Sequence, residues 1–328
     1  MNQTDGVAIP TRIPPLKTGR RILFVASAGG HLTELHRLSQ QMAYSSKSIW
    51  LTFDSPQSRS LLQGCVIMFV PYVSPRDIKG VVRTWIYVAR LMRKEHFDEV
   101  VSTGAAVAVG AFLGACARPI QRTYIESVAR VHRPSLTGRL ISLFRLADLR
   151  TQTTTFGSRR WTSHPSVLKD YESFERAIAE RQSPLRVFVT VGTIRPYRFD
   201  ELLKSVQRCA RVTELEVTWQ TGATDALDLP GVVHSVVDPE TFRRLALEAD
   251  VVVTHAGVGS LLVLFEMGIF PVVVPRRADR REHVDDHQLE LAEIVKQRGL
   301  GLVVDAQGLD VVSLREAARH GVREPRSP

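Results

Sequence analysis

Residues 250–275 read DVVVTHAGVGSLLVLFEMGIFPVVVP. The run begins as an apolar strand, turns through two glycines, continues with a helical pattern and returns at once to a strand. Such strand–helix–strand units build parallel sheets. Glycines let backbone amides approach an anion, and a helix N-terminus adds unpaired N–H groups. The stretch predicts an α/β domain whose turn, with Gly257, Gly259 and Ser260, binds an anion; glycines that only permit packing are the alternative.

The same alternation extends in both directions from this stretch. Strands are expected at 21–28, 49–53, 66–73, 99–102, 123–128, 185–191, 215–219, 232–236, 251–254, 270–274 and 301–304. A chain of 328 residues suits two α/β domains, so we expect two doubly wound parallel sheets. The expected limits are a flexible segment 1–19, a first domain 20–163, a linker 164–184, a second domain 185–321 and a tail 322–328.

Composition narrows the class of protein. Hydrophobic residues make up 44% of the chain and the mean hydropathy is −0.04, as in globular proteins. No apolar run near the N-terminus resembles a secretory signal, and residues 102–117 are too short to span a bilayer. Cys65, Cys116 and Cys209 lack zinc or disulfide spacing, so a cytoplasmic protein is expected.

Charge is unevenly placed along the chain. Residues 1–182 carry 25 Lys and Arg against 13 Asp and Glu, whereas residues 183–328 carry 18 against 21. A basic half favours an anionic partner such as phosphates or a membrane face, and a solvated Arg-rich surface is the alternative. No basic strand interleaved with aromatic residues points to a nucleic acid.

Residues 282–293, EHVDDHQLELAE, gather polar side chains at the start of an expected helix. Such side chains can hold sugar hydroxyls or simply cap the helix. The histidines and aspartates of this segment are also possible metal ligands, but no matching set stands elsewhere, so no metal is expected.

Together, residues 255–260, the strand up to Pro275 and Asp286-His287-Gln288 resemble the donor-binding domain of family 28 glycosyltransferases. Residues 188–193 and 199–202 resemble the opening of the same domain in the catalytic subunit of the two-subunit N-acetylglucosaminyltransferase of the dolichol pathway. The first half resembles its membrane-recruiting partner subunit, at residues 27–32, 102–104, 124–127, 129–130, 137–138 and 147–148. Similar fused or paired transferases occur in bacterial exopolysaccharide assembly.

The resemblance implies a GT-B fold, in which two Rossmann-like domains face a central cleft. It implies a UDP-sugar donor, no cofactor, a lipid-linked glycan acceptor and membrane proteins of polysaccharide assembly as possible partners. The implied donor-binding residues are Gly192, Thr193, Gln220, Thr221, Gly222, His255, Gly257, Gly259, Ser260, Asp286, His287 and Gln288. The residues implied on the acceptor and phosphate side are Gly29, Gly30, Ser127 and Arg130.

One position departs from the family pattern. The family usually places a glutamate three residues after the serine of the glycine turn, where it binds ribose, and this chain has Val263. Glu266 lies one turn further along the same helix face and is expected to substitute.

The expected mechanism is metal-independent and inverting. His31 follows Gly29-Gly30 at the end of the first strand, so it is the candidate base that takes the proton of the acceptor hydroxyl. Glu126 is the competing candidate. A hydrogen bond from His31 to nearby backbone, with no catalytic role, is the alternative.

A helix from Asp77 to Lys94 predicts a membrane contact. Arg83 and Arg90 belong to a basic stripe beside an apolar face that contains Trp85. This pattern suits an anionic membrane and predicts a peripheral protein on the inner face of the plasma membrane. The alternative packs the apolar face on the sheet.

Three other functions fit parts of the sequence. A nicotinamide-dependent oxidoreductase would use Gly29-Gly30 and Asp54, but the G-x-G-x-x-G spacing is missing. A nucleotide-sugar epimerase shares the architecture. A non-catalytic donor-binding or recruiting subunit would explain Val263.

Overall fold

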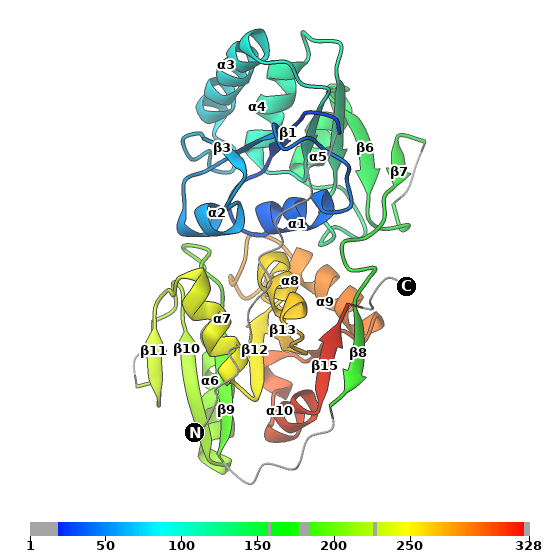
Figure 1. Ribbon diagram of the computed structural model, residues 1–328. Coiled ribbons are helices and arrows are strands. Elements are labelled where there is room, and N and C mark those ends of the chain that lie inside the picture. Colours follow the sequence, from blue (N-terminus) through cyan, green and yellow to red (C-terminus); the bar gives the residue numbers. More distant parts are fainter. Residues whose placement is uncertain (1–18, 157–158, 177–183, 226–227, 325–328) are drawn as a thin grey trace, which may run out of the picture.

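The computed structural model describes residues 19–156, 159–176, 184–225 and 228–324. Two α/β domains lie one above the other along the molecule (Figure 1). Most of the expected N-terminal segment, the second part of the expected linker and the last four residues lie outside the described residues. The fold class expected from the sequence is confirmed.

The first domain is built on a seven-stranded sheet. Its strands are β1 (Ile22–Val25), β2 (Ile49–Thr52), β3 (Val66–Phe69), β4 (Glu99–Ser102), β5 (Gln121–Ile125), β6 (Asp148–Thr151) and β7 (Trp161–Ser163), in the order β3-β2-β1-β4-β5-β6-β7. Its helices are α1 (Gly30–Ser39), α2 (Pro56–Leu61), α3 (Ile78–Lys94), α4 (Ala106–Ala115) and α5 (Leu136–Leu143). Every pair of neighbouring strands is parallel.

The second domain repeats this plan with a six-stranded parallel sheet. Its strands are β9 (Leu185–Thr190), β10 (Leu215–Gln220), β11 (Val232–His234), β12 (Val251–His255), β13 (Val272–Val274) and β14 (Leu302–Val303), in the order β11-β10-β9-β12-β13-β14. Its helices are α6 (Asp200–Val212), α7 (Pro239–Glu248), α8 (Val258–Glu266), α9 (His287–Gln297), the 3-10 turn η1 (Ala306–Gly308) and α10 (Val311–Ala318).

Strand order reverses between β1 and β4 in the first sheet and between β9 and β12 in the second. Open α/β sheets bind ligands outside the carboxyl ends of the strands at such reversals. The glycine turns noted in the sequence follow β1, β9 and β12, so all three stand where ligand sites form. The strands at these reversals are mostly apolar and buried, as expected where helices cover both faces of a sheet.

A short antiparallel pair was not expected from the sequence. β8 (Glu172–Glu175) lies in the expected linker and pairs with β15 (His320–Arg323) at the far end of the chain. Val322, placed in the expected tail, is buried. Part of the linker and part of the tail therefore belong to the ordered fold.

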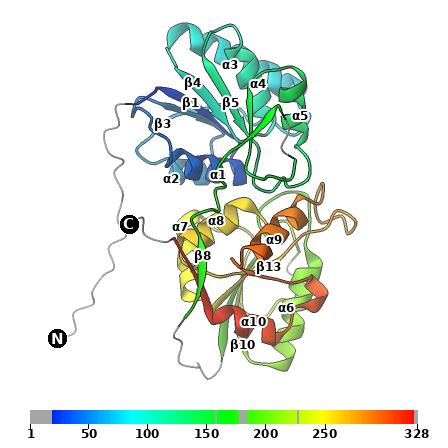
Figure 2. The same ribbon diagram turned by 90° about the vertical axis from the view of Figure 1, so that its right-hand side faces the viewer.

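The domains meet through α1 and α8, which lie side by side in both ribbon views (Figures 1 and 2). Leu32 and Leu35 of α1 belong to the same buried apolar cluster as Leu261 and Leu262 of α8. The two domains thus share a core. Among the described residues, no helix is both long and apolar enough to cross a bilayer.

Candidate functional site

Two predicted donor-binding turns follow β9 and β12, which are neighbours in the second sheet. The His255 ring lies between them: a Cβ atom on Gly192 would be 2.6 Å from its Cε1 atom, and one on Gly257 would be 2.2 Å from its Nε2 atom. A side chain at either position would therefore displace the imidazole, and Gly192 also has a φ of 77°, which favours glycine. Thr193, the next residue of the first turn, is exposed.

His255 is an uncharged part of this arrangement. Burial, and then the charge of Arg276, lowers the pKa of His255 to about 3. The ring is neutral at pH 7, and its role in the structure is to support both turns from beneath.

The predicted segment Gln220-Thr221-Gly222 reaches the first turn from β10. A Cβ atom on Gly222 would be 2.1 Å from the Gly192 carbonyl oxygen, so the two backbones touch. Gln220 is buried and accepts a hydrogen bond from the Thr190 hydroxyl at 3.2 Å, and Thr221 is also buried. The structure brings this segment to the turn but directs the Gln220 side chain inward.

The turn before α8 is also the contact between the domains. A Cβ atom on Gly259 would be 3.2 Å from the Cα atom of Gly30 at the start of α1. Gly29 has a φ of 94°, which favours glycine, and Ser260 is half-buried in the first turn of α8. The N-termini of two helices, one from each domain, therefore face each other here.

Glu266 lies away from this junction. It is the last residue of α8 and lies about 9 Å along the helix from Ser260, since each residue adds about 1.5 Å. Burial raises the pKa of its carboxyl, and the charge of Arg37 on α1 opposes that rise. The structure thus places the expected substitute for the missing glutamate at the far end of the helix from the turn.

His31 lies in the first turn of α1 and packs on the Gly104 backbone after β4. Its Nδ1 atom is buried and has no hydrogen-bond partner among the described residues. Burial first, and then the charges of His287 and Arg130, lowers the pKa of His31 to about 4. The ring is therefore neutral at pH 7 and has an unoccupied nitrogen.

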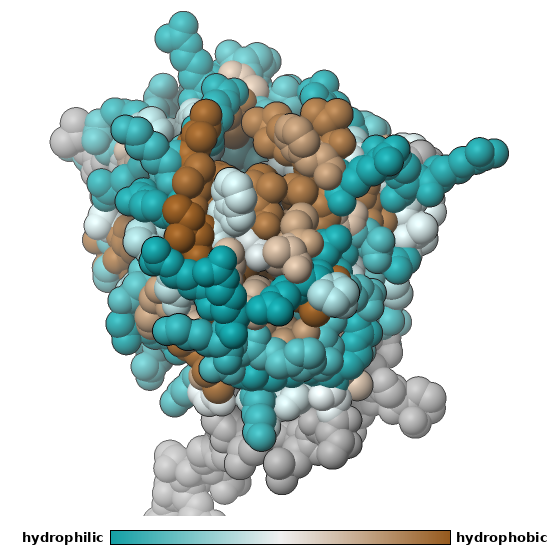
Figure 3. All heavy atoms as spheres, turned by 90° about the horizontal axis from the view of Figure 1, so that it is seen from above, coloured by the Kyte–Doolittle hydropathy of each residue, from teal (hydrophilic) through white to brown (hydrophobic). Residues whose placement is uncertain are grey.

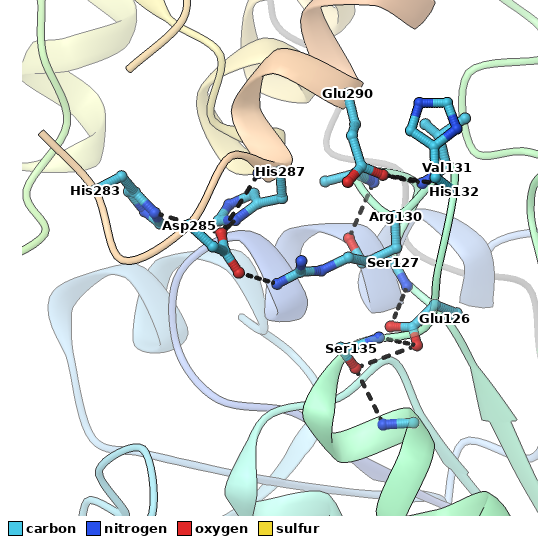
Figure 4. Close-up of polar contacts among 12 residues, drawn as sticks. Glu126, Ser127, Arg130, Val131, His132, Ser135, His283, Asp285, His287 and Glu290 are labelled. Atoms are coloured by element: carbon cyan, nitrogen blue, oxygen red, sulfur yellow. Dashed lines mark hydrogen bonds and ion pairs between the residues drawn. The ribbon is translucent and has the colours of Figure 1, made fainter. Parts of the chain in front are cut away.

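A cluster at the start of α9 crosses to the first domain (Figure 4). Asp285 accepts a hydrogen bond from Arg130 at 2.7 Å and a short one from His287. Burial alone would raise the pKa of Asp285, but its contacts with His283, His287 and Arg130 hold it well below the usual range. Asp285 thus links the predicted acceptor-side arginine to the predicted donor-side histidine.

The same cluster offers possible metal ligands. One atom each of His283, Asp285 and His287 lies within 4.8 Å of the others. The second oxygen of Asp285 holds the Arg130 guanidinium, and this positive charge opposes a divalent cation at the same place.

The other two residues predicted to reach the donor sugar hold the preceding loop. Asp286 is exposed and accepts a hydrogen bond from the Ala278 amide at 2.9 Å. Gln288 is buried, and its carbonyl accepts one from the Arg276 amide at 3.1 Å. Of the three predicted residues, only His287 lies in the interdomain cluster.

Glu126 is only 1% exposed, and its carboxylate turns into the first domain. It accepts hydrogen bonds from the Tyr124 hydroxyl at 2.9 Å and from the Ser135 amide at 2.9 Å. Burial raises its pKa. These contacts fix the loop that carries Ser127, which is buried, and Arg130 (Figure 4).

Two acidic residues near the site were missed by sequence reasoning. Glu290 of α9 accepts hydrogen bonds from the Val131 amide at 2.6 Å and the His132 amide at 3.1 Å, which adds a second polar link between the domains. Glu34 is fully buried beneath the same loop, and burial raises its pKa to about 7. Both could have been noticed in the sequence, because Glu290 lies within one helical turn of His287 and Glu34 within one helical turn of His31.

Four arginines, Arg276, Arg277, Arg280 and Arg281, lie in the loop after β13. Arg276 is fully buried. Arg277 and Arg280 pair with Asp305, so neither of them is a freely solvated side chain.

In the structure, the side of α3 that contains Trp85 and Ile86 is not covered by the sheet. The helix contacts α4 through a different side, where its buried residues are Gly80, Thr84, Val88, Leu91 and Met92. Trp85 and Ile86 remain 44% and 46% exposed. Arg83 and Arg90 are exposed beside them. Seen from the α3 end of the molecule, apolar side chains gather in a patch bordered by hydrophilic ones (Figure 3).

Comparison with known families gives a match over the second domain. Residues 186–328 match the family model described as the glycosyltransferase family 28 C-terminal domain. The second domain is thus similar to the C-terminal domain of these glycosyltransferases. The match covers the glycine turn before α8 and the start of α9. No curated protein sequence matches the chain.

Solved structures match both domains together. MurG of Acinetobacter baumannii has a TM-score of 0.56 and 18% identity, over 90% of this chain and 89% of its own. The spinosyn forosaminyltransferase SpnP has a TM-score of 0.58 and 15% identity, over 92% and 89%. A putative UDP-N-acetylglucosamine 2-epimerase of Listeria monocytogenes has a TM-score of 0.56 and 11% identity, over 92% and 94%. The expected GT-B architecture is confirmed, and at this identity it does not decide the reaction.

Proposed function

We propose that the chain is an inverting glycosyltransferase that moves a sugar from a UDP-sugar to a lipid-linked glycan acceptor. The match to the family 28 domain supports a nucleotide-sugar donor. The observation that carries the proposal is His31: a neutral imidazole with an unpartnered buried nitrogen, next in the chain to Gly30, whose backbone contacts Gly259 of the α8 turn.

In the proposed reaction, the acceptor hydroxyl oxygen attacks the anomeric carbon of the donor. The bond from that carbon to the diphosphate breaks, and UDP leaves with the electron pair. The hydroxyl proton passes to His31 as the new bond forms. A single displacement inverts the anomeric configuration. The amides and helix dipoles of the glycine turns stabilise the charge that grows on the diphosphate.

The donor is tested by a panel of nucleotide sugars in thermal unfolding of the full chain. A bound ligand raises the melting temperature by mass action. We expect UDP compounds to protect the protein and nicotinamide dinucleotides not to. Protection by nicotinamide dinucleotides alone would contradict the proposal.

A nucleotide-sugar epimerase is the second candidate, and the fold match to the Listeria protein favours it. An epimerase converts the donor without an acceptor, whereas a transferase releases UDP only when the sugar is transferred. Mass spectrometry and NMR of the products, with and without lipid-linked acceptors, separate the two. Donor binding without turnover of either kind would favour a non-catalytic subunit.

The proposed acceptor is lipid-linked because α3 has the surface expected for an anionic membrane. Its exposed apolar side chains lie beside Arg83 and Arg90, at the end of the first domain that faces away from the second (Figures 1 and 3). Trp side chains suit the headgroup region, and basic residues attract anionic lipids. The chain then works on the inner face of the plasma membrane, next to membrane proteins of polysaccharide assembly.

Liposome sedimentation tests the membrane contact. The double variant Arg83→Glu, Arg90→Glu should bind vesicles with 30% phosphatidylserine at least about tenfold more weakly, since each basic residue contributes about 1 kcal/mol there. Arg211→Glu with Arg244→Glu is the matched control, because both lie on helices of the second domain. Equal sedimentation of all three proteins would contradict the proposed surface.

A further inference from the structure

Arg276 is a buried cation that lies behind the turn after β9, one of the two turns proposed to bind the donor diphosphate. It follows β13, and its side chain has no exposed surface. It forms no ion pair within the described residues, and the nearby Glu282 carboxylate accepts instead from the Arg277 amide at 2.9 Å. Burial lowers the pKa of Arg276 to about 10, against the raising effect of the Glu282 charge, so the guanidinium stays charged at pH 7. A buried guanidinium that no carboxylate contacts directly is costly unless other polar groups stabilise it.

The guanidinium is held by backbone carbonyls of two loops. Nη2 donates to the carbonyl of Val191 at 2.7 Å, and Nη1 donates to that of Glu282 at 2.8 Å. Nη1 also lies 3.1 Å and 3.2 Å from the carbonyls of Tyr197 and Arg198. One side chain therefore ties the turn after β9 to the loop before α9.

These contacts set the direction of one amide. The Val191 carbonyl and the Gly192 N–H belong to the same planar trans peptide, so they point in opposite directions. Because the carbonyl points at Arg276, the Gly192 N–H points away from it, and it has no hydrogen-bond partner among the described residues. The turn thus presents an unpaired donor with a fixed positive charge behind it.

We propose that Arg276 is the positioning residue of a diphosphate-binding turn, where its charge does the work of a metal ion. This inference rests on the proposed function for the identity of the donor. The guanidinium does not touch the diphosphate: it orients the Gly192 amide and supplies the positive potential that a dianion needs in a desolvated site. The chemistry recognised is a diphosphate, either free or as part of a nucleotide.

The test compares ligands with and without a diphosphate, by calorimetry on the full chain. The probes are UDP, inorganic pyrophosphate and uridine. Arg276→Met should weaken UDP and pyrophosphate by at least about tenfold, the loss expected for one charge-assisted hydrogen bond, while uridine binding stays unchanged. Arg277→Met is the matched control, because the neighbouring arginine pairs with Asp305, and it should bind all three probes as wild type does.

Arg276→Lys covers the case in which Arg276→Met does not fold. Lysine keeps the charge but cannot donate to several carbonyls in a fixed fork, so UDP affinity should fall between those of wild type and the Met variant. Equal weakening of UDP and uridine would show a merely structural role and overturn the inference. Unchanged UDP affinity in a folded variant, or a wild type that binds neither UDP nor pyrophosphate, would also overturn it. Failure of sugar transfer alone bears on the proposed function only.

Discussion

The turn after β1 and the turn after β12 occupy corresponding positions in two similar sheets, and each has a histidine beside it, the half-buried His31 at the first and the buried His255 at the second. Burial is the main cause of a low pKa in both, about 4 for His31 and about 3 for His255. Their surroundings differ. The His255 ring is enclosed by two glycines of its own domain, whereas His31 has an unpartnered nitrogen near charges of the other domain. The same fold position therefore supports a turn in one domain and is suited to proton transfer in the other.

The largest effect is expected at His31. His31→Ala should lower kcat by about 10²–10⁴-fold, the contribution of a general base, and leave UDP affinity near that of wild type. His132→Ala is the control, because that side chain is exposed and only its backbone contacts the second domain. A His31→Ala enzyme whose kcat stays within a few-fold of wild type would show that His31, like His255, is not the general base.

Arg130→Met should change the pH at which His31 works. The Arg130 charge lowers the pKa of His31, so its removal raises that pKa. The activity loss on acidification should then begin at a higher pH than in wild type, where it is set by a pKa of about 4. A pH profile of kcat measures this, with Arg133→Met, an exposed neighbour, as the control. An unshifted acidic limb would contradict the coupling between Arg130 and His31.

Replacing His255 should change the pH dependence of the free energy of unfolding rather than the rate of turnover. Its folded pKa of about 3 lies below the ordinary value of 6.5, so the unfolded chain binds a proton that the folded chain does not. Its contribution to the free energy of unfolding therefore falls by about 1.4 kcal/mol per pH unit as the pH drops from about 6.5. His255→Asn should lack this part of the slope in urea titrations at several pH values. Identical slopes in variant and wild type would refute it.

The smallest change in turnover is expected at Glu126. Glu126→Gln should reduce stability by about 1–3 kcal/mol, because the amide cannot accept all of the hydrogen bonds that the carboxylate accepts. It should leave kcat within a few-fold, since the side chain turns into the domain. Thermal unfolding and steady-state kinetics on the same sample check both effects. A hundredfold loss of kcat at unchanged stability would transfer the base role to Glu126.

Both sheets were predictable because their central strands are apolar runs that end in glycine turns. The β8–β15 pair was not, since polar strands separated by most of the second domain leave no local periodicity. The sequence also predicted which residues lie near the site, but not the direction in which their side chains point. Glu126 and Gln220 turn inward because of partners that come together only in the fold, Ser135 for the first and Thr190 for the second.

Burial of charge was the other property that local sequence concealed. Arg276 stands in a run of arginines, and only the carbonyls of distant loops explain why this one is enclosed. The exposure of the apolar face of α3 was also not predictable from local sequence. Glycines of α4 let that helix approach α3 closely at Thr84 and Val88, so the face that contains Trp85 stays uncovered.

The core shared by α1 and α8 also limits how the two halves can move. Pulling them apart would expose the leucines of both helices to water, at about 25 cal/mol for each Å² of apolar surface. The two halves should therefore unfold together, in one calorimetric transition, and two separate transitions would contradict a shared core.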